Sequence, residues 1–234
     1  MMDNTQLNEL SIGEIVTSDF RASTVFMEAG IDFCCGGKQN LSEACLEKGI
    51  EKETVLKKLQ NLENEPISHT LNFKDWELGF LCDYIVNTHH SFVKAKMPEL
   101  VFYTSKIASV HGEHHPELIE VADLFDKINK ELTQHMKNEE EVLFPAIKEV
   151  ITSGGAKSKG VIASEIERLF AEHDFAGGTM DHINKITKSY LLPEDACNTY
   201  QVSFKLLHQF EDDLHVHVHL ENNILFPKAL ELAK

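Results

Sequence analysis

One tract of sequence occurs twice in this chain, and the repetition limits what the chain can fold into. Residues 135–145 read HMKNEEEVLFP and residues 217–227 read HVHLENNILFP, so both copies fit the pattern His-x3-Glu-x3-Leu-Phe-Pro. Another histidine precedes each copy, since His90 lies 45 residues before the first copy and His173 lies 44 residues before the second. Self-similarity of this kind is typical of a structure built from repeated units. The sequence therefore predicts two related helix pairs, each with one histidine on its first helix and a His/Glu pair on its second.

The spacing inside the repeat suits a metal site between helices. His135 and Glu139, and likewise His217 and Glu221, stand four residues apart, so each pair projects from one helix face with Cβ atoms about 5–6 Å apart. An imidazole and a carboxylate so placed can bind one metal ion, or the carboxylate can bridge two. Because packed helices lie about 8–10 Å apart, the inward faces of four helices can converge on one dinuclear centre.

After residue 72 the chain has the pattern of four long helices. Apolar residues recur at three-to-four spacing, and the alternation typical of strands is absent. We expect the helices near residues 74–110, 117–150, 159–190 and 194–232. Short loops between long helices favour antiparallel neighbours. The predicted fold class is all-α, with an up-and-down four-helix bundle over residues 73–234.

The first part of the chain, residues 1–64, reads as a small helical domain. Gly30 and Gly49 stand where glycines commonly end helices, and residues 32–38 (DFCCGGK) form a loop with two adjacent cysteines, Cys34 and Cys35. Residues 64–72, which contain Pro66 and Ser68, are expected to be a linker. The helices expected in this domain are Ser11–Val16, Ser18–Ala29, Leu41–Lys48 and Glu51–Leu62.

The proposed ligands fall on the apolar faces of their helices, which predicts that they are buried. His135 and Glu139 continue the stripe that runs through Leu132 to Val142, and the second copy and His173 lie on similar stripes. Glutamate is almost never fully buried unless it is paired or bound to metal, and an unpaired buried carboxylate is costly. Metal ligation removes that cost, so four inward histidines and two inward glutamates favour a metal site over a core with a few hydrogen-bonded histidines.

The first helix leaves a choice between His89 and His90. The stripe through His90 continues to Leu100 and Ile107, whereas the stripe through His89 ends at charged residues, so His90 is preferred. His111 shares the His90 stripe but lies 21 residues on, which is roughly 30 Å along a helix. The other histidines are interpreted as ordinary polar residues. Among them, His215 and His219 are expected to be solvated.

The ligand set predicts the metal. Four histidines and two glutamates give nitrogen and oxygen donors without thiolates, which disfavours structural zinc, and magnesium or calcium would require more oxygen ligands. Iron fits best, with manganese second. Two octahedral ions bridged by two carboxylates and an oxo or hydroxo group would keep about one open position each, enough for O2, NO or peroxide.

Composition excludes several other functions. Lys and Arg number 22 against 38 Asp and Glu, and the net charge of −16 opposes a nucleic-acid partner. No apolar run approaches the roughly 18 residues of a membrane span, and the N-terminal residues lack the features of a signal peptide. Five cysteines without a regular framework suit a reducing compartment. We therefore expect a cytoplasmic protein without a membrane partner, in which Cys45, Cys82 and Cys197 are packing residues.

The repeated His-x3-Glu before Leu-Phe-Pro, with a histidine on each preceding helix, resembles the hemerythrin-like domain. The oxygen carriers of that group have a second histidine one turn after the third-helix ligand, where this chain has Gly177, and an Asp near the last ligand, where this chain has Glu. The departures count against reversible O2 carriage and imply a more open site.

The N-terminal part narrows the resemblance to the repair-of-iron-centres proteins, which pair a small domain with a di-iron hemerythrin-like domain. The residues that carry it are Ile12-Gly13-Glu14-Ile15-Val16, Phe26 to Gly30, Asp32 to Gly37, Glu172-His173-Asp174 and Leu220-Glu221-Asn222-Asn223.

This resemblance implies a function and a set of site residues. It implies repair of iron–sulfur clusters damaged by nitrosative or oxidative stress, by iron donation, by reduction of NO to N2O as a di-iron oxidoreductase, or both. The partners would be damaged iron–sulfur proteins and small ligands, and a homodimer is plausible. The alternative is an O2 or NO sensor or carrier without turnover. By position, the iron ligands are His90, His135, Glu139, His173, His217 and Glu221; Glu131 and Glu172 line the site and its access path; and Cys34 and Cys35 are a redox or iron-relay pair.

Overall fold

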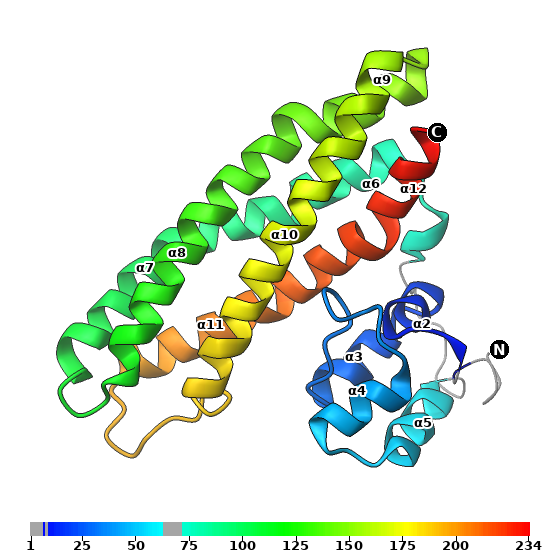
Figure 1. Cartoon of the computed structure of the whole chain (residues 1–234). Coiled ribbons are helices and arrows are strands. Elements are labelled where there is room, and N and C mark those ends of the chain that lie inside the picture. Colours follow the sequence, from blue (N-terminus) through cyan, green and yellow to red (C-terminus); the bar gives the residue numbers. More distant parts are fainter. Residues whose placement is uncertain (1–6, 8, 63–71) are drawn as a thin grey trace.

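The structure, a computed structural model, describes residues 7, 9–62 and 72–234. Helices dominate this part of the chain, and its only β pairing is an isolated bridge between Ser11 and Asn40. Four long helical rods run antiparallel, and a small helical unit lies beside one end of them (Figure 1). The predicted all-α class is confirmed. Most of the predicted linker, and His69, fall outside the described residues.

Each rod of the bundle corresponds to one predicted helix, but three of the four rods are interrupted by a wider π-helical turn. Among the described helices, none is both long and apolar enough to cross a membrane. The first rod is α6 (Leu78–Ile85), the π segment η3 (Val86–His90) and α7 (Ser91–His111), preceded by the short 3-10 helix η2 (Phe73–Asp75). The second is α8 (Glu117–Asn138), the π segment η4 (Glu139–Leu143) and α9 (Phe144–Ser153). The third is α10 (Ala156–Ile186). The fourth is α11 (Asn198–His219), the π segment η5 (Leu220–Leu225) and α12 (Phe226–Leu232).

The two prolines of the repeat account for two of the π segments. Pro145 and Pro227 each stand in the first turn of the helix that follows a π segment. Proline has no N–H and its ring clashes with the carbonyl four residues earlier, and a wider turn relieves that clash. The wider turn also changes which of its own residues face inward, so Val142, predicted to face inward, is 38% exposed while Leu143 is buried.

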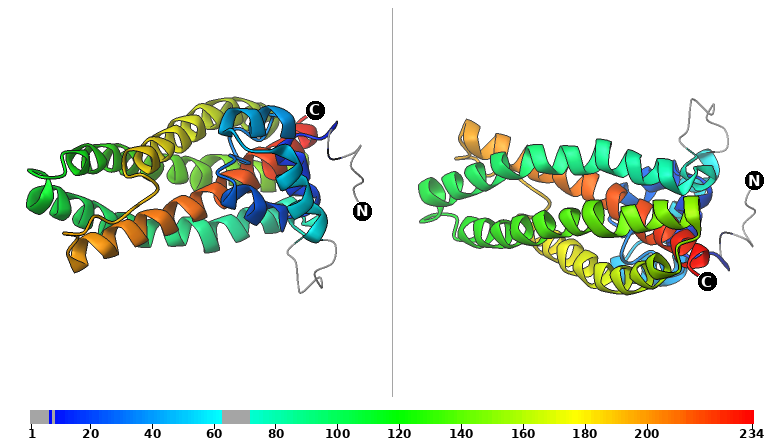
Figure 2. Two further views of the ribbon diagram at one scale, coloured as in Figure 1. Left: turned by 90° about the horizontal axis from the view of Figure 1, so that it is seen from below. Right: turned by 90° about the horizontal axis from the view of Figure 1, so that it is seen from above.

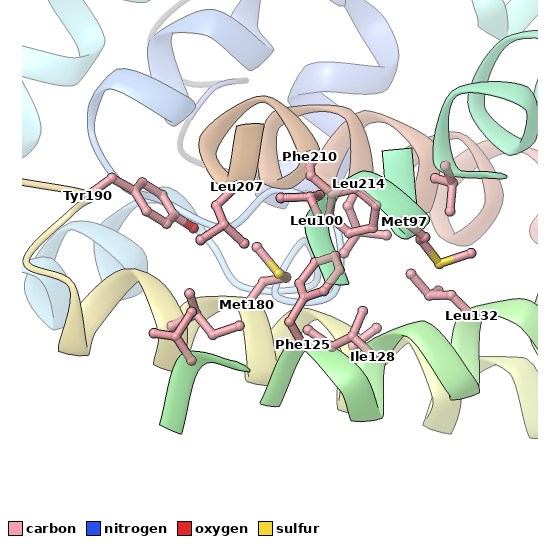
Figure 3. Close-up of a cluster of buried hydrophobic side chains, with 14 of the residues drawn as sticks. Met97, Leu100, Phe125, Ile128, Leu132, Met180, Tyr190, Leu207, Phe210 and Leu214 are labelled. Carbon is pink, nitrogen blue, oxygen red and sulfur yellow. The ribbon is translucent and has the colours of Figure 1, made fainter. Parts of the chain in front are cut away.

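The core of the bundle consists of two apolar clusters with the polar site between them. The distal cluster includes Leu100, Phe125 and Phe210, which interleave from α7, α8 and α11 (Figure 3). The proximal cluster, around Leu143 and Leu225, fills the end that carries both α9 and α12. The dry packing on both sides holds the ligand-bearing turns in place, because close-packed interiors tolerate little displacement.

The N-terminal unit has its own core and well-formed helix ends. Ser11 and Asn40 each form a capping box with the glutamate three residues on, and Gly49 ends α4 with φ of +66°, where L-residues are disfavoured. The helix predicted from Ser18 to Ala29 is shorter, because Arg21 is its N-cap. The helices are α2 (Ile12–Ser18), α3 (Ala22–Glu28), α4 (Leu41–Lys48) and α5 (Lys52–Asn61).

The cysteine loop of this unit packs against the bundle near its C-terminal end (Figure 2). Asn223 donates hydrogen bonds to the carbonyl oxygens of Phe33 and Cys34, both at 3.3 Å. The Nδ1 atom of His219 lies 3.3 Å from the same Phe33 oxygen, and His219 is fully buried. The expectation that His219 is solvated was therefore wrong, because the N-terminal unit covers it. His215 is half-buried, with its ring 6.1 Å from that of Phe33.

Candidate metal centre

The six residues predicted as metal ligands converge inside the bundle. Each of them is at most 1% exposed. Their ligand atoms form two groups within which all atoms lie within 4.8 Å of one another, and both groups contain Glu139 and Glu221. The first group adds His90 and His217, and the second adds His135 and His173. Two carboxylates shared by two pairs of histidines is the arrangement expected for two neighbouring ions bridged by carboxylates.

The imidazole Nε2 atoms point at the carboxylates. Glu139 Oε2 lies 3.3 Å from Nε2 of His90 and 3.3 Å from Nε2 of His135. Glu221 contacts one histidine of each group, with Oε1 at 3.0 Å from His217 Nε2 and Oε2 at 3.1 Å from His173 Nε2. Each carboxylate therefore links histidines from two different helices.

Three of the histidines are oriented through their other ring nitrogen. His90 Nδ1 lies 2.7 Å from Glu140, and His135 Nδ1 lies 2.8 Å from Glu172. His173 Nδ1 lies 2.7 Å from Asn222 Oδ1. Partners of this kind hold a ligating imidazole in one orientation and one tautomer, with the Nδ1 proton donated outward and the Nε2 lone pair left for the metal.

This tautomer provides a test of whether a cation fits. Nε2 of His135 and Nε2 of His173 lie 3.1 Å apart. With both Nδ1 atoms donating to oxygen acceptors, either a proton on one Nε2 or a metal ion must lie between these two nitrogens, because two facing lone pairs would repel each other. His90 Nε2, both oxygens of Glu139 and Glu221 Oε2 are buried without a hydrogen-bond partner. Unpartnered buried groups are costly, and a bound cation would remove that cost, so the donor set fits a metal.

The charges in the cluster couple metal binding to protons. Burial disfavours a charged His135, but the Glu139 and Glu172 carboxylates outweigh it and raise the pKa of His135 to about 10. Burial likewise opposes ionisation of Glu221, yet His217 and His173 hold the pKa of this carboxyl well below its ordinary range. The carboxylates thus stay ionised, and a metal ion must displace a proton from His135.

Each repeat also supplies an aromatic wall to the site. Phe144 stacks on the His90 ring with centroids 5.8 Å apart, and Phe226 stacks on the His173 ring at 5.6 Å. The Leu-Phe-Pro part of the motif is thereby explained. Its phenylalanine fixes a histidine of the paired helix, and its proline accompanies the π turn that carries the glutamate.

The repeat contains the orienting residues as well, although the sequence analysis did not identify two of them. Glu140 follows Glu139, and Asn222 follows Glu221, so the position after each glutamate orients the histidine of the first helix in its pair. Comparing that position in both copies, and asking for a hydrogen-bond acceptor in each, would have found them.

His89 lies beside the cluster but not in it. The wide turn of η3 buries both His89 and His90, at 4% and 0% exposure. His89 Nδ1 bonds to Asp213 at 2.9 Å, and its ring stacks on His217 with centroids 5.4 Å apart and planes 9° apart. The preferred choice of His90 as the cluster histidine agrees with this geometry.

The two carboxylates predicted to line the access path differ in position. Glu172 contacts His135 and also accepts a hydrogen bond from Arg168. Glu131 is exposed on α8, one turn before His135, and no hydrogen bond or ion pair joins it to the cluster within the described part of the chain. A role for Glu131 stays a prediction.

The adjacent cysteines lie directly against the ligand-bearing helix α10. Cys35 Sγ is 3.4 Å from the carbonyl oxygen of His173, and a Cβ atom on Gly177 would stand 3.2 Å from the same sulfur. The chain therefore places a thiol where a side chain at position 177 would extend. Cys34 is buried. The neighbouring Cys35 thiol, burial and Asp32 all raise the pKa of the Cys34 thiol.

The remaining cysteines divide into two kinds. Cys45 and Cys82 are buried, as predicted for packing residues. Cys197 is exposed, so its interpretation as a packing residue was wrong. It stands at the N-cap of α11, outside the helix that would have turned it into the core.

Comparison with known proteins agrees with this architecture. Residues 8–63 match ScdA_N, described as a domain of unknown function (DUF542), and residues 83–229 match the hemerythrin HHE cation binding domain. The chain is 32% identical over 219 residues to "Iron-sulfur cluster repair protein ScdA" of Staphylococcus epidermidis, a match that covers 93% of this chain and 96% of that protein. It is 36% identical over 223 residues to "Iron-sulfur cluster repair protein YtfE" of Dickeya chrysanthemi, covering 94% and 96%.

A Yersinia pestis protein also named "Iron-sulfur cluster repair protein YtfE" is 35% identical over 223 residues, again covering 94% and 96% of the two chains. These matches extend over both the N-terminal unit and the bundle, and the hemerythrin-like part contains the buried His/Glu cluster. The chain belongs to the family of iron-sulfur cluster repair proteins that includes ScdA and YtfE.

Proposed function

We propose that the chain holds two iron ions between its four bundle rods and uses them in the repair of damaged iron–sulfur clusters. The observation that carries this proposal is the sharing of Glu139 and Glu221 by two pairs of histidines. Nitrogen and oxygen donors in this ratio suit iron better than zinc, magnesium or calcium. In this proposal the two glutamates bridge the ions, while His90 and His217 hold one and His135 and His173 hold the other.

Reduction of NO to N2O is the activity that we assign to this centre, and iron at the site would supply the redox chemistry and the binding of NO. The chain's own contribution includes the thiol pair. Two NO molecules take up two electrons and two protons to give N2O and water, and oxidation of Cys34 and Cys35 to a disulfide releases two electrons and two protons. Their sulfurs lie 3.9 Å apart, so the loop would have to close to the bond length of about 2 Å.

Iron donation is the second activity that the same loop supports. Ligand atoms of Asp32, Cys34 and Cys35 lie within 4.8 Å of one another, and Cys35 touches the backbone of His173. In this proposal, a metal ion that leaves the bundle passes to the thiol and carboxylate ligands of this neighbouring loop. A damaged iron–sulfur protein would be the acceptor. In either activity, Gly177 leaves room for Cys35, so the space one turn after His173 is filled by sulfur and not by a further imidazole.

The experiment is an anaerobic titration of the reduced, iron-loaded protein with NO, followed by measurement of N2O and of free thiols. Two Fe(II) ions would supply two electrons and the thiol pair two more, so we expect about two N2O per chain, with loss of two thiols, when no other reductant is present. The double variant Cys34→Ala, Cys35→Ala should keep its iron but give about half of this yield, while Cys197→Ser, at an exposed thiol elsewhere, should match the wild type.

Two other outcomes of these measurements separate the candidate functions. A stable, reversible NO adduct without N2O would contradict the reductase proposal and support a sensor or carrier. Transfer of iron to an apo iron–sulfur protein, abolished in the double cysteine variant and not in Cys197→Ser, would support donation.

A further inference from the structure

The end of the bundle away from the metal centre carries a cysteine–histidine pair. Cys197 caps α11, and its Sγ lies 3.2 Å from Nε2 of His111, the last residue of α7. His111 follows His90 by 21 residues on the same rod, which is roughly 30 Å at 1.5 Å per residue. The pair is therefore a separate feature from the proposed iron site.

Several other polar groups surround this pair. His115 Nε2 lies 3.0 Å from Asp195, and its Nδ1 lies 3.3 Å from Glu117. The His111 and His115 rings meet with centroids 6.4 Å apart, and both contact the Tyr200 ring, at 5.4 and 5.9 Å. A cavity of about 200 Å³, lined by His115, Tyr200 and Leu191 among others, opens beside them. Neither Cys197 nor His111 lines this cavity, so the surroundings of the exposed thiol are His111, which hydrogen-bonds to it, and the His115 and Tyr200 rings beside His111.

We propose that Cys197 is a thiol-modification site that exchanges with disulfides of small thiols, with His111 as the hydrogen-bond donor to its sulfur. In the exchange, the Cys197 sulfur attacks one sulfur of the small disulfide. A new S–S bond forms to Cys197, the S–S bond of the small molecule breaks, and the released thiolate takes up a proton from solvent. The step is neutral in electrons and requires no further oxidant.

Three features of the surroundings favour reaction at this cysteine. It is exposed, whereas Cys34, Cys45 and Cys82 are buried. The hydrogen bond from His111, aided by backbone N–H groups of the first turn of α11, lowers the pKa of the Cys197 thiol to about 7. Helix N-termini and neighbouring histidines are the surroundings that activate cysteines, and an attacking thiol is most effective when its pKa is near the ambient pH. Burial, in contrast, raises the pKa of Cys82 to about 12.

The position of the other cysteines determines what happens to the product. Cys35, next to Cys34, contacts the middle of α10 at His173, Cys82 is on α6, and Cys45 is inside the N-terminal unit. None of them stands at the distal end of the bundle to displace the small thiol. The mixed disulfide at Cys197 therefore persists until an external thiol reduces it.

The first test uses oxidised glutathione as the probe on the full-length protein, with peptide mass spectrometry to quantify each cysteine. We expect Cys197 to form the mixed disulfide at least ten times faster than Cys45 or Cys82. Its rate should rise with pH about a midpoint near 7. A midpoint near the ordinary thiol value of about 8.5, or equal rates at the three cysteines, would overturn the proposal.

The second test is the variant His111→Phe, which keeps a ring against Tyr200 but removes the N–H donor. We expect the midpoint to rise by about one pH unit or more and the rate at pH 7 to fall about threefold, because the higher intrinsic reactivity of a more basic thiolate offsets part of the loss. His114→Phe, at an exposed residue of the same turn, should leave both unchanged. Identical profiles for His111→Phe and the wild type would refute the role of His111. If Cys45 and Cys82 react as slowly in His111→Phe as in the wild type, the variant is folded. If the variant does not fold, the pH profile of Cys197 in the wild type tests the proposal by itself.

Discussion

The two halves of the metal centre come from a repeated sequence, yet their surroundings differ. In the half that contains His135 and His173, both Nδ1 atoms have oxygen partners, Glu172 and Asn222. In the half that contains His90 and His217, only His90 has such a partner, and His217 Nδ1 is buried without one.

The difference traces to one position in the repeat. The residue before the first-helix histidine is Glu172 in one copy and His89 in the other. Glu172 accepts from the histidine of the opposite helix pair, whereas His89 stacks on His217 and bonds to Asp213 instead. A duplicated motif has thus produced two unequal metal positions, and the His135/His173 position is the better anchored. It is also the half that the thiol loop touches, through Cys35 and His173.

Removing a shared carboxylate should abolish metal binding in both halves of the centre. Glu139→Leu deletes a group that contacts histidines of both halves, so we expect the iron content to fall from two ions per chain to near zero. Elemental analysis of the purified variant measures this. Glu141→Leu, two residues away and exposed, is the matched control. Wild-type iron in Glu139→Leu would contradict the ligand assignment.

Removing an orienting residue should weaken one half selectively. Glu172→Ala leaves His135 Nδ1 without its acceptor, and losses of this kind typically cost about 10–100-fold in metal affinity. Competition with a chelator should then show one ion weakened more than the other. Glu165→Ala is the control, because Glu165 pairs with the same Arg168 but not with His135. Equal effects of the two substitutions would assign the loss to Arg168 and not to His135.

Acid should release metal from the half that contains His135. The carboxylates around His135 outweigh burial and raise its pKa to about 10, so below that pH the imidazole is protonated in the metal-free protein and must lose a proton to bind metal. Apparent affinity therefore falls as pH falls, by about tenfold per pH unit for each proton displaced. Chelator competition between pH 6 and 8 measures the slope. An affinity independent of pH over this range would argue against His135 as a ligand.

The smallest expected effect concerns the contact with the thiol loop. Alanine is favoured over glycine in a helix by up to about 1 kcal/mol, so Gly178→Ala, where an added methyl meets no atom within 4 Å, should stabilise the protein by up to that amount. Gly177→Ala should gain less, because its methyl would stand 3.2 Å from Cys35 Sγ. Denaturant unfolding compares the two. A larger gain for Gly177→Ala would mean that the loop does not pack on α10 as described.

Much of this architecture could be predicted from the repeat. Helix periodicity placed the four rods. The His-x3-Glu spacing identified four of the six residues that the structure brings together, and the preceding histidines on apolar stripes, His90 and His173, gave the other two. The π segments were not predicted. Pro145 and Pro227 follow two of them, but a proline indicates only that a helix kinks or ends and does not specify a π turn, and residues 86–90 have no such marker. This is why Val142 was expected inside the core and His89 seemed an alternative to His90.

Contacts between parts of the chain that are distant in sequence could not be predicted either. On an isolated α11, His219 would face solvent. It is buried because Phe33 and its loop cover it. Cys197 lies one residue before α11 begins. The predicted helix began near residue 194, so the sequence analysis placed Cys197 inside the helix and interpreted it as a packing residue.

The central claim is that six residues hold two iron ions at two unequal positions. It is tested most directly by titrating the metal-free protein with Fe(II) under anaerobic conditions and measuring bound iron per chain. We predict two ions per chain, taken up in two resolvable steps, with the affinity of the first step lowered selectively, by about 10–100-fold, in Glu172→Ala. Saturation at one ion per chain, or no binding above that of Glu139→Leu, would contradict the account.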